Sequence, residues 1–258
     1  MRIALTGGAT GIGASVLRKL AGQGHEVVVF DIAEPADHAQ SWICTDISNP
    51  DAIDAALAQV EGRFDGLVNN AGLPPRDGLE EAILRVNFLG LRRFLDGMVG
   101  RLSDGASVVN VASRAGAAWR DSVDEIKGLM ACDHATVAAF VAERGIDPVR
   151  AYNLSKEAVI ALTLARTEAM VARGLRINSV SPAAVSTGIL DDFTAAFGEK
   201  VARNIARAGR AGEADEVADV ILFLLSPQSH WIKGQDIVID GGMTAMAMSD
   251  ALGFGDPA

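Results

Sequence analysis

The sequence is poor in the residues that build disulfide frameworks and metal centres. It has two cysteines, Cys44 and Cys132, and four scattered histidines in 258 residues. A chain of this length buries enough surface to form a core without a disulfide or a metal. We therefore interpret the cysteines as reduced thiols of a cytoplasmic protein. No histidine has a metal-ligand spacing, so we expect no metal site.

Long hydrophobic runs and an excess of positive charge are also lacking. No apolar stretch approaches the roughly 18 residues that a membrane-spanning helix needs. Lys and Arg number 23 against 33 Asp and Glu, a formal net charge of −10. Such a chain is a poor ligand for nucleic acids or anionic membranes. With 49% hydrophobic residues, the chain is instead expected to be a soluble globular protein that acts on a small molecule.

Short β-branched runs alternate with longer stretches of helical periodicity. Near-continuous apolar strands separated by helices are typical of a parallel sheet that helices cover on both faces. The pattern predicts a Rossmann-type, doubly wound seven-stranded α/β fold with a ligand crevice at the carboxyl ends of its strands. The predicted strands are residues 2–6, 26–30, 42–45, 66–69, 107–111, 176–180 and 236–239. The predicted helices are residues 11–23, 50–61, 79–101, 151–173 and 213–226.

No linker or repeat divides the chain, so residues 1–258 are expected to form a single dinucleotide-binding and catalytic domain. Residues 114–150 interrupt the alternation, because they are far longer than an ordinary connection between a strand and a helix. Within them, residues 121–145 carry apolar side chains at helical spacing. We expect a helical insertion after the fifth strand.

A glycine-rich turn, Thr6-Gly7-Gly8-Ala9-Thr10-Gly11-Ile12-Gly13, joins the first strand to the first helix. Glycines at such a turn let the backbone approach a pyrophosphate, and the helix N-terminus offers free N–H groups to it. The spacing departs from G-x-G-x-x-G, and a glycine-rich turn can also be only a tight connection.

Asp31 follows the second strand, where a carboxylate can accept both hydroxyls of an adenosine ribose and repel a 2′-phosphate. The uncharged Thr10 and Ile32 beside it also favour NAD over NADP. An Asp at this position can alternatively cap a turn.

Tyr152 and Lys156 are four residues apart in a predicted helix, so their side chains share one face. A nearby ammonium favours phenolate over phenol and is expected to lower the pKa of Tyr152. Tyr152 would then serve as the general base for an alcohol or the general acid for a ketone. Taken alone, such a pair is more often two residues on a solvated helix face.

Five motifs taken together resemble the short-chain dehydrogenase/reductase family, and the resemblance covers nearly the whole chain. They are the glycine turn, Asn69-Asn70-Ala71-Gly72, Ser113, the Tyr152/Lys156 pair and Asp240-Gly241-Gly242, in this order. The resemblance implies a catalytic set of Asn87, Ser113, Tyr152 and Lys156. Ser113 would bind the substrate oxygen, Asn87 would hold a proton-relay water, and Lys156 would also bind the nicotinamide ribose. The expected NAD-binding residues are Gly7, Thr10, Gly11, Ile12, Gly13, Asp31, Asp46, Ile47, Asn70, Ala71, Gly72, Tyr152, Lys156, Pro182, Val185 and Thr187.

The long segment between Ser113 and Tyr152 resembles a subgroup of the family that contains bacterial 3α-hydroxysteroid dehydrogenases and coniferyl-alcohol dehydrogenases. The resemblance also implies a flap at residues 187–210 that closes the substrate pocket. Leu190, Phe193 and Trp119 are candidates for an apolar wall, together with Ser113 and Tyr152 as substrate contacts. Such a wall would suit a hydrophobic cyclic or aromatic alcohol or its carbonyl compound.

The expected activity is NAD-dependent oxidoreduction of such an alcohol, and the family implies a homo-oligomer, either dimer or tetramer. One alternative is a 3-oxoacyl-carrier-protein reductase, which is disfavoured because both the carrier and this chain are acidic. Another is a catalytically silent nucleotide-binding protein. The complete set of Asn87, Ser113, Tyr152 and Lys156 argues against it.

Overall fold

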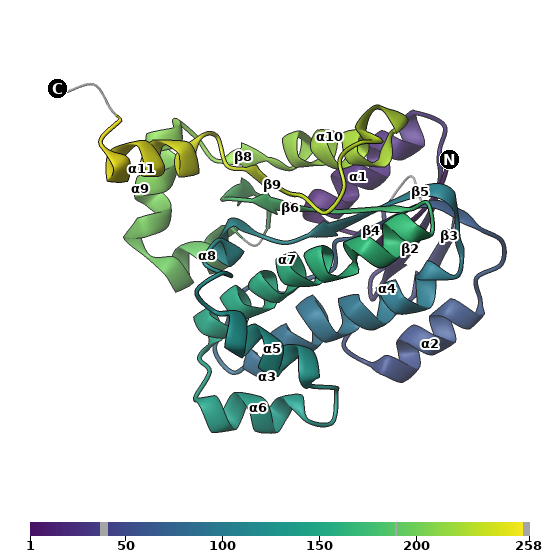
Figure 1. Ribbon diagram of the computed structural model, residues 1–258, viewed down its shortest axis with the longest axis horizontal. Coiled ribbons are helices and arrows are strands. Elements are labelled where there is room, and N and C mark those ends of the chain that lie inside the picture. Colours follow the sequence, from purple (N-terminus) through teal and green to yellow (C-terminus); the bar gives the residue numbers. More distant parts are fainter. Residues whose placement is uncertain (37–40, 189, 255–258) are drawn as a thin grey trace.

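The computed structural model describes residues 1–36, 41–188 and 190–254, and its centre is a parallel β-sheet (Figure 1). Seven strands lie in the order β3-β2-β1-β4-β5-β6-β9, and each neighbouring pair is parallel. The order reverses direction between β1 and β4, which confirms the doubly wound fold. The strands are β1 (Arg2–Thr6), β2 (Glu26–Asp31), β3 (Ser41–Cys44), β4 (Phe64–Asn69), β5 (Leu102–Val111), β6 (Arg176–Pro182) and β9 (Asp236–Ile239).

Alternate residues of the central strands bury their side chains on opposite faces of the sheet. Ile3 and Leu5 pack into the cluster beneath α1 (Gly11–Gly22) and α10 (Ala214–Leu225). Ala4 packs into the larger cluster on the other face. This larger cluster lies beneath α2 (Pro50–Ala58), α4 (Leu91–Val99) and α7 (Pro148–Ala172). Both faces are therefore dry, which explains why the strands are apolar throughout rather than alternating.

Two helices begin at a polar cap residue that is followed by proline. Asn49 accepts hydrogen bonds from the backbone N–H groups of Asp51 and Ala52 at the start of α2. Asp147 accepts one from Arg150 at the start of α7. In both helices the proline occupies the first helical position, where its missing N–H leaves no bond unmade. The caps thereby set where the helices that flank the site begin.

The predicted helix at residues 79–101 is interrupted in the structure. It consists of α3 (Glu80–Leu84), a π-helical turn η1 (Arg85–Gly90) and α4. Gly90 lies so close to the Ile47 carbonyl that a β-carbon on it would stand 2.0 Å from that oxygen. The π-helical turn contains Asn87. Wide turns of this kind inside α-helices are often found at functional sites.

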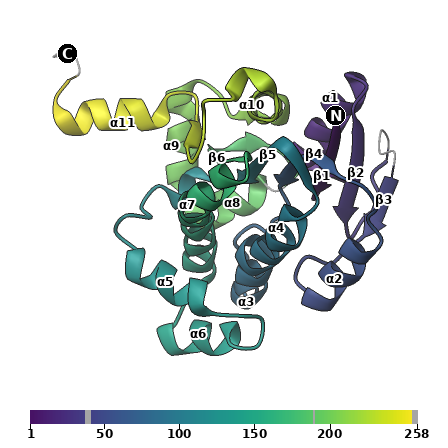
Figure 2. The same ribbon diagram turned by 45° about the vertical axis from the view of Figure 1, so that its right-hand side comes forward.

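The helical insertion lies between β5 and α7. A short 3₁₀ turn, η2 (Arg114–Gly116), is followed by α5 (Val123–Ala131) and α6 (Val137–Arg144). These two helices lie outside the helices on one face of the sheet, next to α3 and α7 (Figure 2). Their apolar residues Ile126, Leu129, Val137 and Phe140 join the core cluster on that face.

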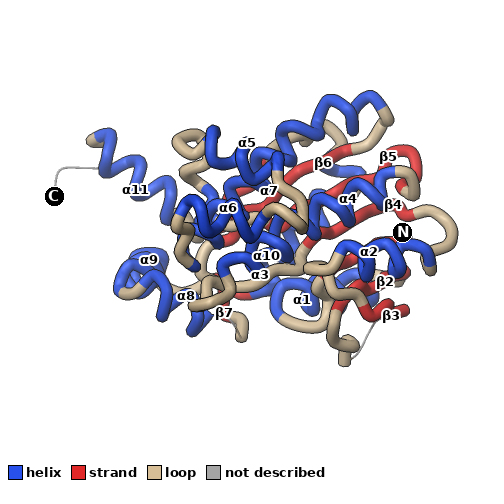
Figure 3. Tube along the Cα trace, turned by 90° about the horizontal axis from the view of Figure 1, so that it is seen from below, coloured by secondary structure: helices blue, strands red, loops and turns tan. Residues whose placement is uncertain are grey.

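Three of the last four α-helices, α8 (Leu190–Phe197), α9 (Glu199–Ala208) and α11 (Met243–Leu252), lie towards one end of the sheet, whereas α10 covers one of its faces (Figure 1). The strand pair β7 (Val185–Ser186) and β8 (Gly212–Glu213) brackets α8 and α9. The final helix α11 projects from the body beside α9, at the end opposite β2 and β3 (Figures 1 and 3). No helix in the described ranges combines the length and the apolar character needed to cross a membrane.

Candidate active site

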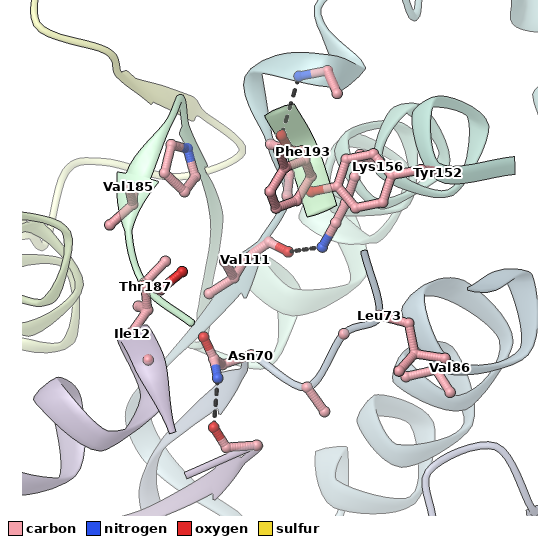
Figure 4. Close-up of a pocket in the computed structure, with 18 of the residues that line it drawn as sticks. Ile12, Asn70, Leu73, Val86, Val111, Tyr152, Lys156, Val185, Thr187 and Phe193 are labelled. Carbon is pink, nitrogen blue, oxygen red and sulfur yellow. Dashed lines mark hydrogen bonds between the residues drawn. The ribbon is translucent and has the colours of Figure 1, made fainter. Parts of the chain in front are cut away.

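A pocket of about 930 Å³ opens where β1, β2, β4, β5 and β6 end (Figure 4). At one end it is lined by Gly7, Gly11 and Asp31, and at the other by Ser113 and Tyr152. Its further predicted lining residues are Thr10, Ile12, Asp46, Ile47, Asn70, Ala71, Gly72, Lys156, Pro182, Val185, Thr187 and Phe193. Gly13 and Asn87 stand behind the wall rather than on it. A cleft of this extent is long enough for a dinucleotide with a small substrate beyond it.

The glycine turn needs its glycines for two different reasons. Gly7 and Gly11 have φ angles of +70° and +57°, which side chains strongly disfavour. Gly13 has no room for a side chain, because a β-carbon there would lie 1.9 Å from the Gly7 carbonyl oxygen. The turn thus leaves an open cradle at the N-terminus of α1. A β-carbon on Gly11 would be in van der Waals contact with Thr187 Cγ2, at 3.6 Å.

The loop after β4 is fixed to this turn by side-chain hydrogen bonds. Thr6 Oγ1 accepts from the backbone N–H groups of Asn70 and Ala71, at 3.0 and 3.2 Å. Asn70 Nδ2 donates to the Gly7 carbonyl at 2.6 Å (Figure 4). Both sides of the cradle are therefore held rigid before any ligand arrives.

Two carboxylates mark the far end of the pocket. Asp31, at the end of β2, accepts hydrogen bonds from Ala9 N at 2.9 Å and Ala33 N at 3.0 Å. These bonds aim its carboxylate along the glycine turn and leave lone pairs for a further donor. Asp46 is exposed and accepts from Ser48, whereas Ile47 is buried beneath it. The arrangement fits an adenosine ribose and its base, and none of the described residues that line this end of the pocket is a cation for a 2′-phosphate.

Tyr152 and Lys156 stand one turn apart on α7, both buried. Lys156 Nζ donates to the Val111 carbonyl at 3.0 Å and lies 5.8 Å from the centre of the Tyr152 ring. Burial lowers the pKa of Lys156 to about 8. Burial also raises the pKa of Tyr152 to about 12, against the opposing effect of a hydrogen bond with Ser113.

The expectation that Lys156 lowers the pKa of Tyr152 is therefore not met by the protein's own groups. Desolvation of the phenolate outweighs the hydrogen bond that favours it. A tyrosine with this pKa is protonated at neutral pH. With only the protein's own residues present, Tyr152 is therefore better suited to donate a proton to a carbonyl oxygen than to accept one from an alcohol.

Ser113 is held at the end of β5, where it caps η2 by accepting a hydrogen bond from Ala115 N at 3.1 Å. Its hydroxyl faces the pocket beside Tyr152. These two hydroxyl groups form a pair that can hold one substrate oxygen, as the resemblance implied.

Asn87 acts on the pocket from behind. Its Oδ1 accepts from Leu73 N at 2.7 Å, and its Nδ2 donates to Leu73 O at 3.0 Å and to Ser155 Oγ at 3.2 Å. The side chain thus clamps the loop after β4 to α7. A β-carbon on Gly72 would lie 3.3 Å from Asn87 Oδ1 and 3.6 Å from Lys156 Nζ, so the glycine leaves an open space between them.

Comparison with known proteins identifies the family. Residues 7–244 match the family model described as enoyl-(acyl carrier protein) reductase. The chain is 32% identical to coniferyl-alcohol dehydrogenase of Pseudomonas sp. strain HR199, over 95% of this chain and 96% of that protein. It is also 32% identical to 3-alpha-hydroxysteroid dehydrogenase/carbonyl reductase of Comamonas testosteroni, over 95% and 96%.

A solved structure agrees with these sequences. The 3-alpha-hydroxysteroid dehydrogenase of Pseudomonas sp. B-0831, solved with NADH, superposes with a TM-score of 0.86 at 33% identity. The match covers 96% of this chain and 99% of that one. The chain belongs to the short-chain dehydrogenase/reductase family.

In this short-chain dehydrogenase/reductase, α8 provides the apolar wall of the substrate end. The Phe193 ring meets the Tyr152 ring edge-on, and Phe197 stacks on Phe193 at 6.3 Å between centroids. The structure does not place Leu190 or Trp119 on the pocket wall. Trp119 packs against the core cluster instead, with the Arg120 guanidinium 4.3 Å from its ring centre. Ile189, within the predicted flap, lies outside the described residues.

Several pocket residues were not predicted from the sequence. Arg150, Asn153 and Glu157 line the substrate end from α7, and Ser122 lines it from the start of α5. Their positions on α7, at i, i+3 and i+7, form one helical stripe beside the Tyr152/Lys156 face. That spacing is visible in the sequence, but only the packing of α5 against α7 shows that the stripe faces a pocket.

Proposed function

We propose that this protein is an NAD-dependent dehydrogenase/reductase that interconverts a hydrophobic cyclic or aromatic alcohol and its carbonyl compound. The observation that carries the proposal is the pairing of the Tyr152 and Ser113 hydroxyls at one end of a pocket whose other end is a glycine cradle beside Asp31. The Phe193 ring against Tyr152 favours a substrate with a ring. The named relatives act on coniferyl alcohol and on hydroxysteroids, which supports the same substrate class.

The residues of the cradle fit NAD. The open backbone of Gly7 and Gly11 would hold the pyrophosphate, and Asp31 the adenosine ribose. Asp46, Ile47 and the loop at residues 70–72 would surround the adenosine. Pro182, Val185 and Thr187 would contact the nicotinamide end. When bound, the cofactor supplies the hydride acceptor for alcohol oxidation or the hydride donor for carbonyl reduction.

The proton chemistry belongs to the protein. Ser113 Oγ and the Tyr152 hydroxyl bind the substrate oxygen, and Tyr152 donates a proton to it as a carbonyl is reduced. In the reverse direction the deprotonated Tyr152, a phenolate, accepts the alcohol proton and becomes the phenol again. Because desolvation raises the pKa of Tyr152 to about 12, the residues present favour this direction less than carbonyl reduction. Asn87 holds the loop beside Lys156, and Phe193 and Phe197 keep water from the reacting carbon.

Two broader expectations complete the proposal. The chain would act as a single catalytic domain with an insertion at residues 114–150 and a flap at residues 187–210, in the cytoplasm. It would form a homodimer or homotetramer. Exposed apolar side chains support assembly, among them Trp231 at 86% exposure and Phe254 at 77%. A sedimentation profile of monomer alone at micromolar concentration would contradict an oligomer.

The decisive test follows NADH formation from NAD⁺ with coniferyl alcohol, cinnamyl alcohol, 3α-hydroxysteroids and simple cyclic alcohols. The proposal predicts turnover of ring-bearing alcohols that Tyr152→Phe abolishes. A variant that keeps its turnover would show that the mechanism is wrong. NAD⁺ binding without oxidation of any alcohol would favour a silent nucleotide-binding protein. Asp31→Ser is expected to shift preference towards NADP⁺, and no shift would remove the ribose assignment.

A further inference from the structure

The substrate end of the pocket has a polar side opposite the phenylalanines of α8. Arg150, Asn153 and Glu157 line it from α7, and Ser122 lines it from the start of α5. None of these residues takes part in the proton chemistry described above. A ring-bearing substrate that reaches Tyr152 would pack its ring against Phe193. Its substituents would then lie against this polar side.

The arginine on this side of the pocket, Arg150, is already paired with carboxylates. Arg150 NH2 donates to Glu125 Oε2 and to Glu157 Oε2, each at 2.7 Å. Arg150 NH1 also donates to Glu157 Oε1 at 3.0 Å, and the Glu157 side chain is only 2% exposed. Two carboxylates therefore share one guanidinium, and the cluster carries a net negative charge. An anionic substituent brought next to it would be repelled.

The other arginine of the wall is also engaged. Arg114 Nε lies 3.4 Å from Asp240 Oδ2 and donates to Thr244 Oγ1 at 3.0 Å. Among the described residues that line the pocket, this leaves Lys156 as the only cation without a carboxylate partner. Lys156 belongs to the proton-transfer machinery. Among the residues whose side chains the structure describes, the substrate end thus offers no free cation for a carboxylate or phosphate on the substrate.

Asn153 supplies an uncharged hydrogen-bonding group in the same place. It lines the pocket next to Tyr152, and its Oδ1 is buried with no hydrogen-bond partner in the part of the chain that the structure describes. A buried amide oxygen without a donor costs free energy, which a ligand can recover if the Asn153 side chain turns this occluded oxygen towards the pocket. Ser122, which forms no cap hydrogen bond with α5, adds a hydroxyl to the same region.

We propose that Asn153 and Ser122 form a subsite for an uncharged hydroxyl substituent of the substrate, remote from the carbon that is oxidised. The hydroxyl donates its proton to the Asn153 amide oxygen. The subsite rests on the proposed function, because it places a ring-bearing alcohol against Tyr152. It goes further by defining the substrate class as ring alcohols with a second, neutral hydroxyl, and it excludes hydroxy acids.

The test compares matched alcohols that differ at one position: cinnamyl alcohol, 4-hydroxycinnamyl alcohol and 4-carboxycinnamyl alcohol, with the corresponding benzyl alcohols as a shorter series. Affinity is measured calorimetrically in the Tyr152→Phe protein with saturating NAD⁺, so the readout does not depend on turnover. kcat/KM is then measured in the wild-type enzyme. In at least one series the hydroxyl compound is expected to bind about three- to tenfold more tightly than its parent. The carboxylate is expected to bind at least about tenfold more weakly.

The residue is assigned with a matched pair of variants. Asn153→Leu keeps the volume and removes the amide, so the preference for the hydroxyl compound should disappear while the parent alcohol binds as before. Asn204→Leu, which changes an asparagine of the same pocket on α9, should keep the preference. In the compound series, the inference is overturned if hydroxyl and parent compounds bind equally in both series, if no alcohol binds at all, or if the carboxylate binds best. In the variants, it is overturned if Asn153→Leu and Asn204→Leu lose the preference for the hydroxyl compound equally. The predicted affinity order without any wild-type turnover would contradict the proposed function and leave the subsite standing.

Discussion

The Phe193 ring stands edge-on to the Tyr152 ring, with centroids 5.2 Å apart and planes inclined by 68°. Phe193 belongs to α8 and Tyr152 to α7, so this contact joins the segment after β6 to the helix that carries Tyr152 and Lys156. The phenylalanine covers the tyrosine from the side that a substrate must approach. A substrate ring therefore has to pack against Phe193 or displace it.

Phe193→Ala is expected to raise KM for ring-bearing alcohols about three- to tenfold, because an aromatic contact is lost. KM for a small acyclic alcohol such as 2-propanol should hardly change. Steady-state kinetics with both alcohols test this. Phe223→Ala, which truncates an exposed phenylalanine on α10, is the control and should leave both KM values unchanged. Equal losses for both alcohols in Phe193→Ala would mean that the ring serves stability rather than recognition.

An ion pair fixes α8 across the mouth of the pocket. Arg76, in the loop after β4, donates two hydrogen bonds to Asp192, at 2.8 and 2.7 Å. Asp192 immediately precedes Phe193. Charge reversal in Arg76→Asp should raise KM for ring-bearing alcohols about two- to fivefold, the modest effect expected of an exposed pair. The double variant Arg76→Asp/Asp192→Arg should restore it.

Salt provides a second test of this ion pair. Raising ionic strength should increase KM in the wild type, where salt screens an attraction, and lower it in Arg76→Asp, where salt screens the repulsion between two carboxylates. Arg93→Asp breaks a comparable exposed pair with Asp54 far from the pocket and should behave as the wild type. A double variant no better than the single one would show that Arg76 acts other than through Asp192.

Lys156 is a buried cation without a carboxylate partner in the described structure, and burial lowers its pKa to about 8. Below pH 8 the folded state holds an unfavourable charge, whereas above about pH 10.5 the lysine is neutral in both states. Unfolding free energy should therefore rise with pH between these values. Lys156→Met should abolish turnover and stabilise the protein at pH 7 by on the order of 3 kcal/mol.

Urea denaturation at pH 7 and pH 10.5 measures this effect. The advantage of Lys156→Met over the wild type should shrink towards zero at the higher pH. A variant that is less stable than the wild type at pH 7 would show that the bond to the Val111 carbonyl outweighs the desolvation of the ammonium.

Asn87 is expected to support both stability and cofactor binding. Asn87→Leu keeps the volume but leaves the Leu73 N–H and carbonyl without partners, which should cost about 2–4 kcal/mol of unfolding free energy. Affinity for NADH should fall with it, because the loop at residues 70–73 lines the pocket. Ser155→Ala keeps both bonds between Asn87 and Leu73. It removes the third bond of Asn87 and the bond that Ser155 Oγ donates to the Tyr152 carbonyl, and should cost about 1–2 kcal/mol. Full stability together with weakened NADH binding would indicate a direct contact instead.

Local sequence patterns predicted the parts of the site that lie on single elements. The glycine turn, Asp31 and the Tyr152/Lys156 pair each depend on one turn or one helix, so spacing alone indicates their geometry. Spacing does not indicate burial. The pKa of Tyr152 was expected to be lowered by Lys156 and is raised instead, because α8 and the core enclose the ring.

Features that join distant segments were not predicted. The bonds between Arg76 and Asp192 span 116 positions, and those of Arg150 with Glu125 span 25. The π-helical turn at Asn87 ends at Gly90, which closely approaches Ile47, and no helical periodicity reveals either feature. Trp119 was a candidate for the apolar wall of the substrate pocket. It is half-buried against the core cluster and is not among the residues that line the pocket.

The Arg150 cluster has a consequence for protein engineering. Its guanidinium neutralises Glu157, which lies directly after Lys156 in the chain, and it is steadied by Glu125 of α5. Cutting residues 117–146 back to a short turn would remove Glu125 and loosen the cation that keeps Glu157 neutralised inside the protein. The inserted helices are therefore not a removable module. If residues 117–146 were inserted into another protein, that protein would also need an arginine and a glutamate at the positions of Arg150 and Glu157.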